Sequence, residues 1–231
     1  MKIDDCAVCI LAGGKGTRLK KVTNNGQKVV AEINGTNVLK FILDQLRKDG
    51  FKEVFILTGY RSYEVKESLK NYSLDLDLIF SEEKEPLGTG GAAKLVSEKI
   101  NKDYLLVING DTILNFSRKR FVENIGINRD FILSVHVNDV SRYGEIKYND
   151  KLEITAMNEK QGIIRAGYIN AGTYILNRQN ILNFHKRIFS LENDYFQKII
   201  KKRLLYVATF NFGFLDIGIP EDFTKAKNFL S

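Results

Sequence analysis

Apolar runs bounded by polar or loop residues recur in the first half of the chain, at residues 6–11, 54–58, 76–80 and 104–108. Each run is separated from the next by a segment that can hold a helix. Residues 38–48 show the helical spacing most clearly, and Gly50 follows them as a stop. Strands rich in β-branched residues and leucine that alternate with helices are typical of a largely parallel sheet covered on both faces. The pattern therefore predicts an α/β fold.

The pattern changes after residue 130. Strand-like pieces appear at 131–137, 143–148, 152–157, 169–176 and 204–210, and helices are expected near 178–188, 192–201 and 220–230. No linker rich in Pro, Gly or Ser and no internal repeat interrupts the sequence. We therefore expect a single domain over residues 1–231, with one half ending near residue 130 and mixed strands extending the same sheet in the other half.

The chain is basic, with a formal charge of +7 from 35 Lys and Arg against 28 Asp and Glu. Such a charge suits anionic ligands, including nucleoside triphosphates, phosphorylated sugars and nucleic acid. The densest basic runs, 118–120 and 201–203, are interpreted as solvated helix faces or turns. Because no nucleic-acid-binding motif and no stripe of stacking aromatics accompanies them, nucleic acid is not expected as a partner.

The two cysteines, Cys6 and Cys9, lie in the first apolar run. Residues three apart on a strand face opposite sides, so these thiols are expected to be buried, unpaired and free of metal. No apolar stretch approaches the roughly 18 residues of a membrane span, and residues 1–5 carry no signal-peptide pattern. A cytoplasmic protein with no membrane partner is expected.

A glycine-rich segment, L-A-G-G-K-G-T-R-L at residues 11–19, directly follows the first predicted strand. Its glycines let backbone amides approach phosphate oxygens at the carboxyl end of a strand, where open α/β sheets bind ligands. The spacing matches neither a dinucleotide fingerprint nor a Walker loop. A plain turn is the alternative, but Lys15 and Arg18 within the loop and Lys28 beyond it favour a phosphate site.

This loop followed by a lysine resembles the signature of the sugar-phosphate nucleotidyltransferases, the family of mannose-1-phosphate guanylyltransferase and glucose-1-phosphate thymidylyltransferase. The resemblance implies a Rossmann-like, glycosyltransferase-A-type fold and transfer of a nucleotide from a nucleoside triphosphate to a sugar 1-phosphate, with release of pyrophosphate. It assigns the triphosphate to Arg18 and Lys28. It assigns nucleotide binding to Leu11, Ala12, Gly13, Gly14, Gly16 and Thr17. The family usually has proline before the lysine, where this chain has Gln27.

A second segment, residues 83–92, resembles the nucleobase-binding turn of that family, with Glu83, Pro86, Gly88 and Thr89 as binding residues. A turn that only starts a helix is the alternative. Relatives specific for uridylyl or thymidylyl groups tend to carry Gln where this chain has Glu83. A carboxylate accepts from both the N1–H and the amine of guanine, whereas uracil and thymine offer one imide donor. Guanine is therefore predicted, with a uridylyl-, cytidylyl- or thymidylyltransferase as the alternative.

A third segment, residues 105–111, is an apolar strand that ends in Asn109-Gly110-Asp111. Asp111 resembles the magnesium-binding aspartate of the family. By the same resemblance, Asn109 is expected to bind the nucleotide. Asp216 opens D-I-G-I-P-E-D, which resembles the late signature of guanylyltransferases for mannose-like and heptose phosphates. A helix cap and a turn residue are the respective alternatives. The resemblance implies that both aspartates hold Mg²⁺, so their carboxylates are expected to converge beside the glycine loop.

Three further pieces resemble the family's sugar-phosphate side: Gly144, the pair Glu159-Lys160, and Asn170 with Gly172. Taken together, the pieces resemble the short guanylyltransferases for D-glycero-α-D-manno-heptose 1-phosphate or mannose 1-phosphate, which supply nucleotide sugars for surface polysaccharides. A catalytically inactive nucleotide-sensing subunit is the alternative from another class. A homodimer is left open by the sequence.

Overall fold

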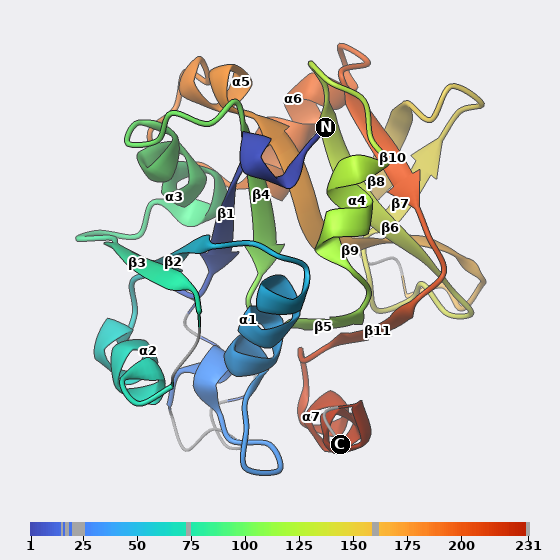
Figure 1. The fold of residues 1–231 in the computed structure, drawn as a ribbon. Coiled ribbons are helices and arrows are strands. Elements are labelled where there is room, and N and C mark those ends of the chain that lie inside the picture. The colour runs from blue at the N-terminus through green and yellow to red at the C-terminus, as the bar shows by residue number, and fades with distance from the viewer. Residues whose placement is uncertain (15, 17–18, 20–25, 73–74, 159–161, 230–231) are drawn as a thin grey trace.

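A mixed sheet forms the centre of the molecule. The computed structural model describes residues 1–14, 16, 19, 26–72, 75–158 and 162–229. Within these residues a nine-stranded sheet runs in the order β10-β6-β9-β4-β1-β2-β3, with β7 and β8 attached at β9, and β5 pairs with β11 in a separate sheet (Figure 1). The strands are β1 (Cys6–Leu11), β2 (Glu53–Thr58), β3 (Asp77–Glu82), β4 (Tyr104–Asn109), β5 (Thr112–Asn115), β6 (Asp130–Val137), β7 (Glu145–Tyr148), β8 (Ile154–Asn158), β9 (Gly167–Asn177), β10 (Leu205–Thr209) and β11 (Gly213–Asp216).

Along the main path of the large sheet, four of the six neighbouring pairs are parallel, and β9 alone is antiparallel to its neighbours, β4 and β6. The helices are α1 (Val38–Lys48), α2 (Ser62–Leu69), α3 (Gly88–Ser97), α4 (Arg118–Glu123), α5 (Arg178–Leu182), α6 (Gln197–Ile200) and α7 (Pro220–Phe229), with tighter or wider turns at η1 (Ile3–Asp5), η3 (Lys28–Val30) and η4 (Leu191–Phe196). None of these described helices has the length and apolar character needed to cross a membrane. The expected mixed, mostly parallel α/β fold is confirmed.

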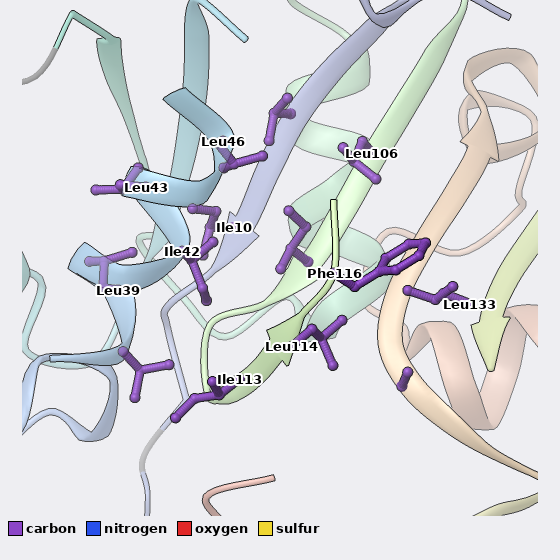
Figure 2. Packing of buried hydrophobic residues seen from close by; sticks show 14 of the residues in the cluster. Ile10, Leu39, Ile42, Leu43, Leu46, Leu106, Ile113, Leu114, Phe116 and Leu133 are labelled. Carbon is purple, nitrogen blue, oxygen red and sulfur yellow. The ribbon is translucent and has the colours of Figure 1, made fainter. Parts of the chain in front are cut away.

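Alternation along β1 divides the core into two layers. Val8 and Ile10 pack on the face covered by α1, while Ala7 and Cys9 pack on the face covered by α3 and α5. Figure 2 shows the first layer, in which Ile42 of α1 lies among side chains from β1, β4 and β5. Both cysteines are free and buried, as expected, and burial raises the pKa of the Cys6 thiol to about 12.

Two features of the structure differ from the expectations drawn from the sequence. The helix expected near 178–188 ends at Leu182, because the following residues turn to pack against the start of α3. Strands β5 and β11 are not predicted by the sequence, since each has four residues and depends on a partner about a hundred residues away along the chain.

Arg118 corrects the interpretation of residues 118–120 as solvated. Its side chain is fully buried at the start of α4. Nη1 donates to the carbonyl oxygens of Leu114, at 3.3 Å, and Phe116, at 2.9 Å, and also to Gln45. Burial lowers the pKa of this guanidinium to about 10. Nη1 alone makes these bonds, whereas Nε and Nη2 have no partner among the described residues, and the charge of Asp49 offsets part of the effect of burial. The two residues that follow are exposed, as expected.

The glycines at the start of α3 allow residues 187–189 to pack very close to this helix. Gly88 has a φ of +76°, and the N–H groups of Gly90 and Gly91 both donate to Phe189 O. A Cβ at Gly90 would lie 2.1 Å from the ring of Phe189, and one at Gly91 would lie 2.5 Å from Arg187 O. Two of the glycines in the predicted binding turn therefore serve packing between α3 and residues 187–189.

We expect Gly90→Ala to destabilise the protein by about 1–3 kcal/mol, the usual cost of overpacking a core. Phe189 is 2% exposed and its ring centroid lies 4.5 Å from that of Phe184, so the ring cannot move aside without displacing buried neighbours. Urea unfolding measures the effect. Gly126→Ala is the matched control, because a Cβ there meets only Phe131 at 3.9 Å. Equal stability of the two variants would contradict the close packing.

Candidate active site

Two cavities open at the edge of the sheet where β1 and β4 end. The larger has a volume of about 700 Å³ and the smaller about 370 Å³. Asn109, Asp111 and Glu192 line both, so the cavities meet at these three side chains. The carboxyl ends of parallel strands are where open α/β sheets bind ligands. The two cavities therefore form one candidate site with two compartments.

The glycine loop forms one wall of the larger cavity, through Leu11, Gly13, Gly14 and Gly16. Ala12 is buried behind this wall, and its N–H donates to Leu57 O at 2.8 Å. At Gly13 a Cβ would come within 3.3 Å of the backbone of β2's following turn, so the loop lies flat against that turn. Lys15, Thr17 and Arg18, predicted from the same motif, lie outside the described residues.

Gln27 holds the loop in place at the position where the family usually has proline. Its side chain is buried, and Nε2 donates to Ala12 O at 2.9 Å and to Tyr60 O at 3.0 Å. The next residue, Lys28, donates from Nζ to Asp111 Oδ2 at 2.6 Å, with 11% of the lysine side chain exposed. Gln27 thus cross-links the glycine loop to the β2 turn, and Lys28 reaches the junction of the two cavities.

The predicted base-binding turn also lines the larger cavity, through Glu83, Pro86, Gly88 and Thr89. Glu83 Oε2 accepts a hydrogen bond from the N–H of Leu87 at 3.0 Å. Burial raises the pKa of Glu83, and the Leu87 hydrogen bond acts in the opposite direction. No other described residue donates to this carboxylate, so a ligand in the cavity finds its Oε1 unpaired.

Asp111 and Asp216 lie next to each other at one end of the small sheet, because Asp111 directly precedes β5 and Asp216 ends β11. Asp216 pairs in register with Thr112, and the N–H of Ile217 donates to Asp111 O at 3.0 Å. Both aspartates line the smaller cavity, and Asp111 lines the larger one as well. The two residues named from distant motifs therefore lie on the same wall.

The smaller cavity also contains Gly144, Asn170 and Gly172, the described members of the predicted sugar-phosphate set. Asn170 Oδ1 accepts from the N–H of Gly172 at 2.9 Å. Gly172 has a φ of +67°, and a Cβ there would lie 2.8 Å from Asn109 Nδ2. Glycine is therefore required where β9 passes the end of β4. Glu159 and Lys160 lie outside the described residues.

Sequence reasoning missed two charged residues of the site. Arg142 lines the smaller cavity and forms a two-point ion pair with buried Asp222, whose hydrogen bonds raise the pKa of the guanidinium. Arg142 directly precedes Tyr143-Gly144, and Asp222 is the last residue of the motif D-I-G-I-P-E-D. The acidic end of this motif was the feature of the sequence that could have indicated a buried cation partner. Glu192 lines both cavities, but it lies in a segment with only an ordinary helical pattern.

Comparison with known proteins gives matches over almost the whole chain. The model of the nucleotidyl transferase family matches residues 7–231. The chain is 34% identical over 215 residues to D-glycero-alpha-D-manno-heptose 1-phosphate guanylyltransferase of Campylobacter jejuni, an alignment that covers 93% of this chain and 95% of the relative. It is 31% identical to mannose-1-phosphate guanylyltransferase catalytic subunit beta of Drosophila melanogaster, over 93% of this chain and 60% of that one.

A solved structure is similar over almost the whole chain. HddC from Yersinia pseudotuberculosis, complexed with GMP-PN, has a TM-score of 0.88 and 33% identity, over 98% of this chain and 100% of that chain. The match of the family model and the similarity in sequence and structure show that this chain belongs to the nucleotidyl transferase family.

Proposed function

We propose that this protein transfers GMP from GTP to D-glycero-α-D-manno-heptose 1-phosphate, releasing pyrophosphate and forming a nucleotide sugar for a surface polysaccharide. The observation that carries the proposal is the pair of cavities that meet at Asp111, one lined by the glycine loop and Glu83 and the other by Asn170 and Gly172. The name of the Campylobacter relative supports it, and the GMP-PN in the similar Yersinia structure supports the guanine nucleotide. Two free cysteines suit a reducing cytoplasm as its location.

Positioning and charge neutralisation carry the proposed chemistry. An oxygen of the sugar phosphate attacks the α-phosphorus in line, and pyrophosphate leaves. Because the attacking oxygen belongs to an anion, no side chain has to remove a proton. The site must instead hold two mutually repelling anions together and neutralise charge on the leaving group. We assign this task to Lys28 at the cavity junction, and to Arg18 and Lys160 by resemblance.

The residues at the junction suit a magnesium ion. Mg²⁺ prefers oxygen ligands and usually binds through one or two carboxylates together with substrate phosphates. Asp111 and Asp216 line one wall of the smaller cavity, and no group of three or more potential ligands among the described residues competes with them. We propose that these two aspartates hold the ion, which would offset phosphate charge. Lys28, which pairs with Asp111, would have to give up this ion pair for Asp111 to hold a metal.

Glu83 supports guanine as the base. Its unpaired Oε1 and the remaining lone pair on Oε2 offer adjacent acceptors for N1–H and the exocyclic amine of guanine. Uracil would fill one of these and leave the other unpaired in a half-buried turn. For the sugar, mannose 1-phosphate is the second candidate, favoured by the similarity to the Drosophila enzyme.

Release of pyrophosphate, measured for each nucleoside triphosphate with a panel of sugar 1-phosphates, tests the proposal. We expect the highest kcat/KM with GTP and the heptose phosphate. A higher kcat/KM with mannose 1-phosphate would make mannose 1-phosphate the assigned sugar substrate in place of the heptose phosphate. A higher kcat/KM with UTP, CTP or dTTP would overturn the assignment of guanine as the base. The absence of turnover with every pair would overturn the proposed function.

We expect Glu83→Gln to lower the preference for GTP over UTP by at least about tenfold in kcat/KM, or about 1.4 kcal/mol, because the amide replaces one acceptor with a donor. Glu82→Gln is the control. It makes the same change of charge on the adjacent residue, whose carboxylate bonds Ser62 and Lys66 at the surface. An unchanged preference in the Glu83 variant would show that its carboxylate does not read the base.

We expect Asp111→Asn to lower kcat/KM by at least about tenfold and to raise the magnesium concentration needed for half-maximal rate, because the change removes a charged ligand and keeps the shape. Thermal unfolding should change little, since 35% of the Asp111 side chain is exposed. Asp150→Asn, at an exposed residue away from both cavities, should leave the rate unchanged. A normal magnesium dependence in the Asp111 variant would exclude it as a metal ligand.

A further inference from the structure

Glu192 stands between the two cavities and is not part of any motif in the sequence. It belongs to η4, a single π-helical turn that leads into α6. Such turns occur often at functional sites, because they place one side chain outside the ordinary helical register. The carboxylate of Glu192 is half-buried and accepts hydrogen bonds from three hydroxyl groups, one from α3, one from β9 and one from Ser190 at the start of its own turn.

One oxygen of this carboxylate faces the nucleotide side. Glu192 Oε2 accepts from Thr89 Oγ1 at 3.0 Å and from Ser190 Oγ at 2.9 Å. Thr89 Oγ1 in turn accepts from the N–H of Leu191 at 2.8 Å, so the hydroxyl has donated its only proton to the carboxylate. Thr89 lies at the start of α3 and lines the larger cavity. The position of Oε2 is thus tied to the predicted base-binding turn.

The other oxygen faces the acceptor side. Glu192 Oε1 accepts from Tyr174 OH at 3.1 Å, and that hydroxyl accepts from Asn170 Nδ2 at 2.9 Å. Tyr174 is fully buried, and burial together with the nearby charge of Glu192 raises its pKa far above the ordinary value, so it remains a donor at neutral pH. With its Oδ1 accepting from Gly172, the amide of Asn170 has one orientation that satisfies both neighbours.

A continuous series of hydrogen bonds therefore runs from Thr89 through Glu192 and Tyr174 to Asn170. A carboxylate is rigid and only accepts, so a displacement of one of its oxygens moves the other. We propose that Glu192 is a positioning residue that couples the two halves of the cleft, so that a nucleotide bound in the larger cavity raises the affinity of the smaller cavity for the sugar 1-phosphate. The inference rests on the proposed function, because it takes those two ligands as the occupants.

Thermodynamic linkage makes the coupling measurable. The dissociation constant of the sugar 1-phosphate, determined by calorimetry without and with saturating α,β-methylene-GTP, gives a coupling factor as its ratio. For the wild type we expect a factor of at least about 5, the low end of ordinary coupling between sites. In Glu192→Gln, an NH₂ donor replaces one carboxylate oxygen and faces a hydroxyl group that also donates. One hydrogen bond of the series is then lost, and the coupling factor should fall towards about 1. Glu98→Gln, an exposed acid at the other end of α3, should keep the wild-type factor.

Two variants separate coupling from simple support of the fold. Tyr174→Phe keeps the ring that packs on Phe196 and removes the hydroxyl, so KM for the sugar 1-phosphate should rise at least about fivefold while KM for GTP stays within about twofold. Thr89→Val should show the opposite split. A structural role alone would lower the melting temperature without dividing the two KM values in this way.

Each outcome has one meaning. Wild-type turnover with an unchanged coupling factor in Glu192→Gln overturns the inference and leaves the proposed function standing. Turnover by the wild type together with loss of the factor supports both. If Glu192→Gln does not fold, the KM values of Tyr174→Phe decide, and equal changes for both substrates would overturn the inference. A wild type that turns over no pair of substrates removes the proposed function itself.

Discussion

The close approach of Gly110 to the end of β1 determines where the other parts of the cleft lie. Its N–H donates to Leu11 O at 3.0 Å, and a Cβ at this position would lie 2.6 Å from that oxygen. Only glycine allows β4 to end in contact with the start of the glycine loop, and Asp111, the next residue, then reaches Lys28. From there the chain enters β5, which pairs with the strand that ends in Asp216. The absence of a side chain at Gly110 thus allows the glycine loop, Lys28 and the two aspartates to lie close to one another.

The positive charge of the chain, +7 overall, is not gathered where the cavities meet. Among the described residues that line the smaller cavity, three are acids, Asp111, Glu192 and Asp216, and Arg142 is the one base. Arg142 itself is paired with Asp222. Two anionic substrates entering this cleft need additional positive charge close by. The metal assigned to the aspartates and the cations expected at positions 18 and 160 would both supply this positive charge.

The sequence predicts best those features that depend on neighbours along the chain. Strands β1, β2 and β4 lie within a residue of their expected positions, because burial on both faces gives each of them a continuous apolar run. The edge strand β3 is largely exposed and lies within two residues of its expected position. The buried state of Arg118 depends on carbonyl groups of its own folded turn, which no pattern of charge reveals. Glu192 is a harder case still, since its partners Thr89 and Tyr174 are brought to it only by the complete fold. Glu83, which lines the larger cavity, was predicted from the sequence because several short motifs occur in a fixed order.

The direction of β9 has a consequence for how such a protein can diverge. Residues 173–177 lie in the sheet against β4, whereas residues 167–170 extend past the end of that strand and pair with β6 and β7. The buried part is held by the same ladder that positions the nucleotide half, so mutations there are disfavoured. Within the extended part, Asn170 is tied through Tyr174 to Glu192. The β7–β8 hairpin also lines the smaller cavity and meets β9 at Glu145 and Ile169, so substitutions in it disturb that ladder less. Lineages that share this scaffold can thus acquire new sugar specificities through one hairpin, while the machinery for the nucleotide is inherited intact.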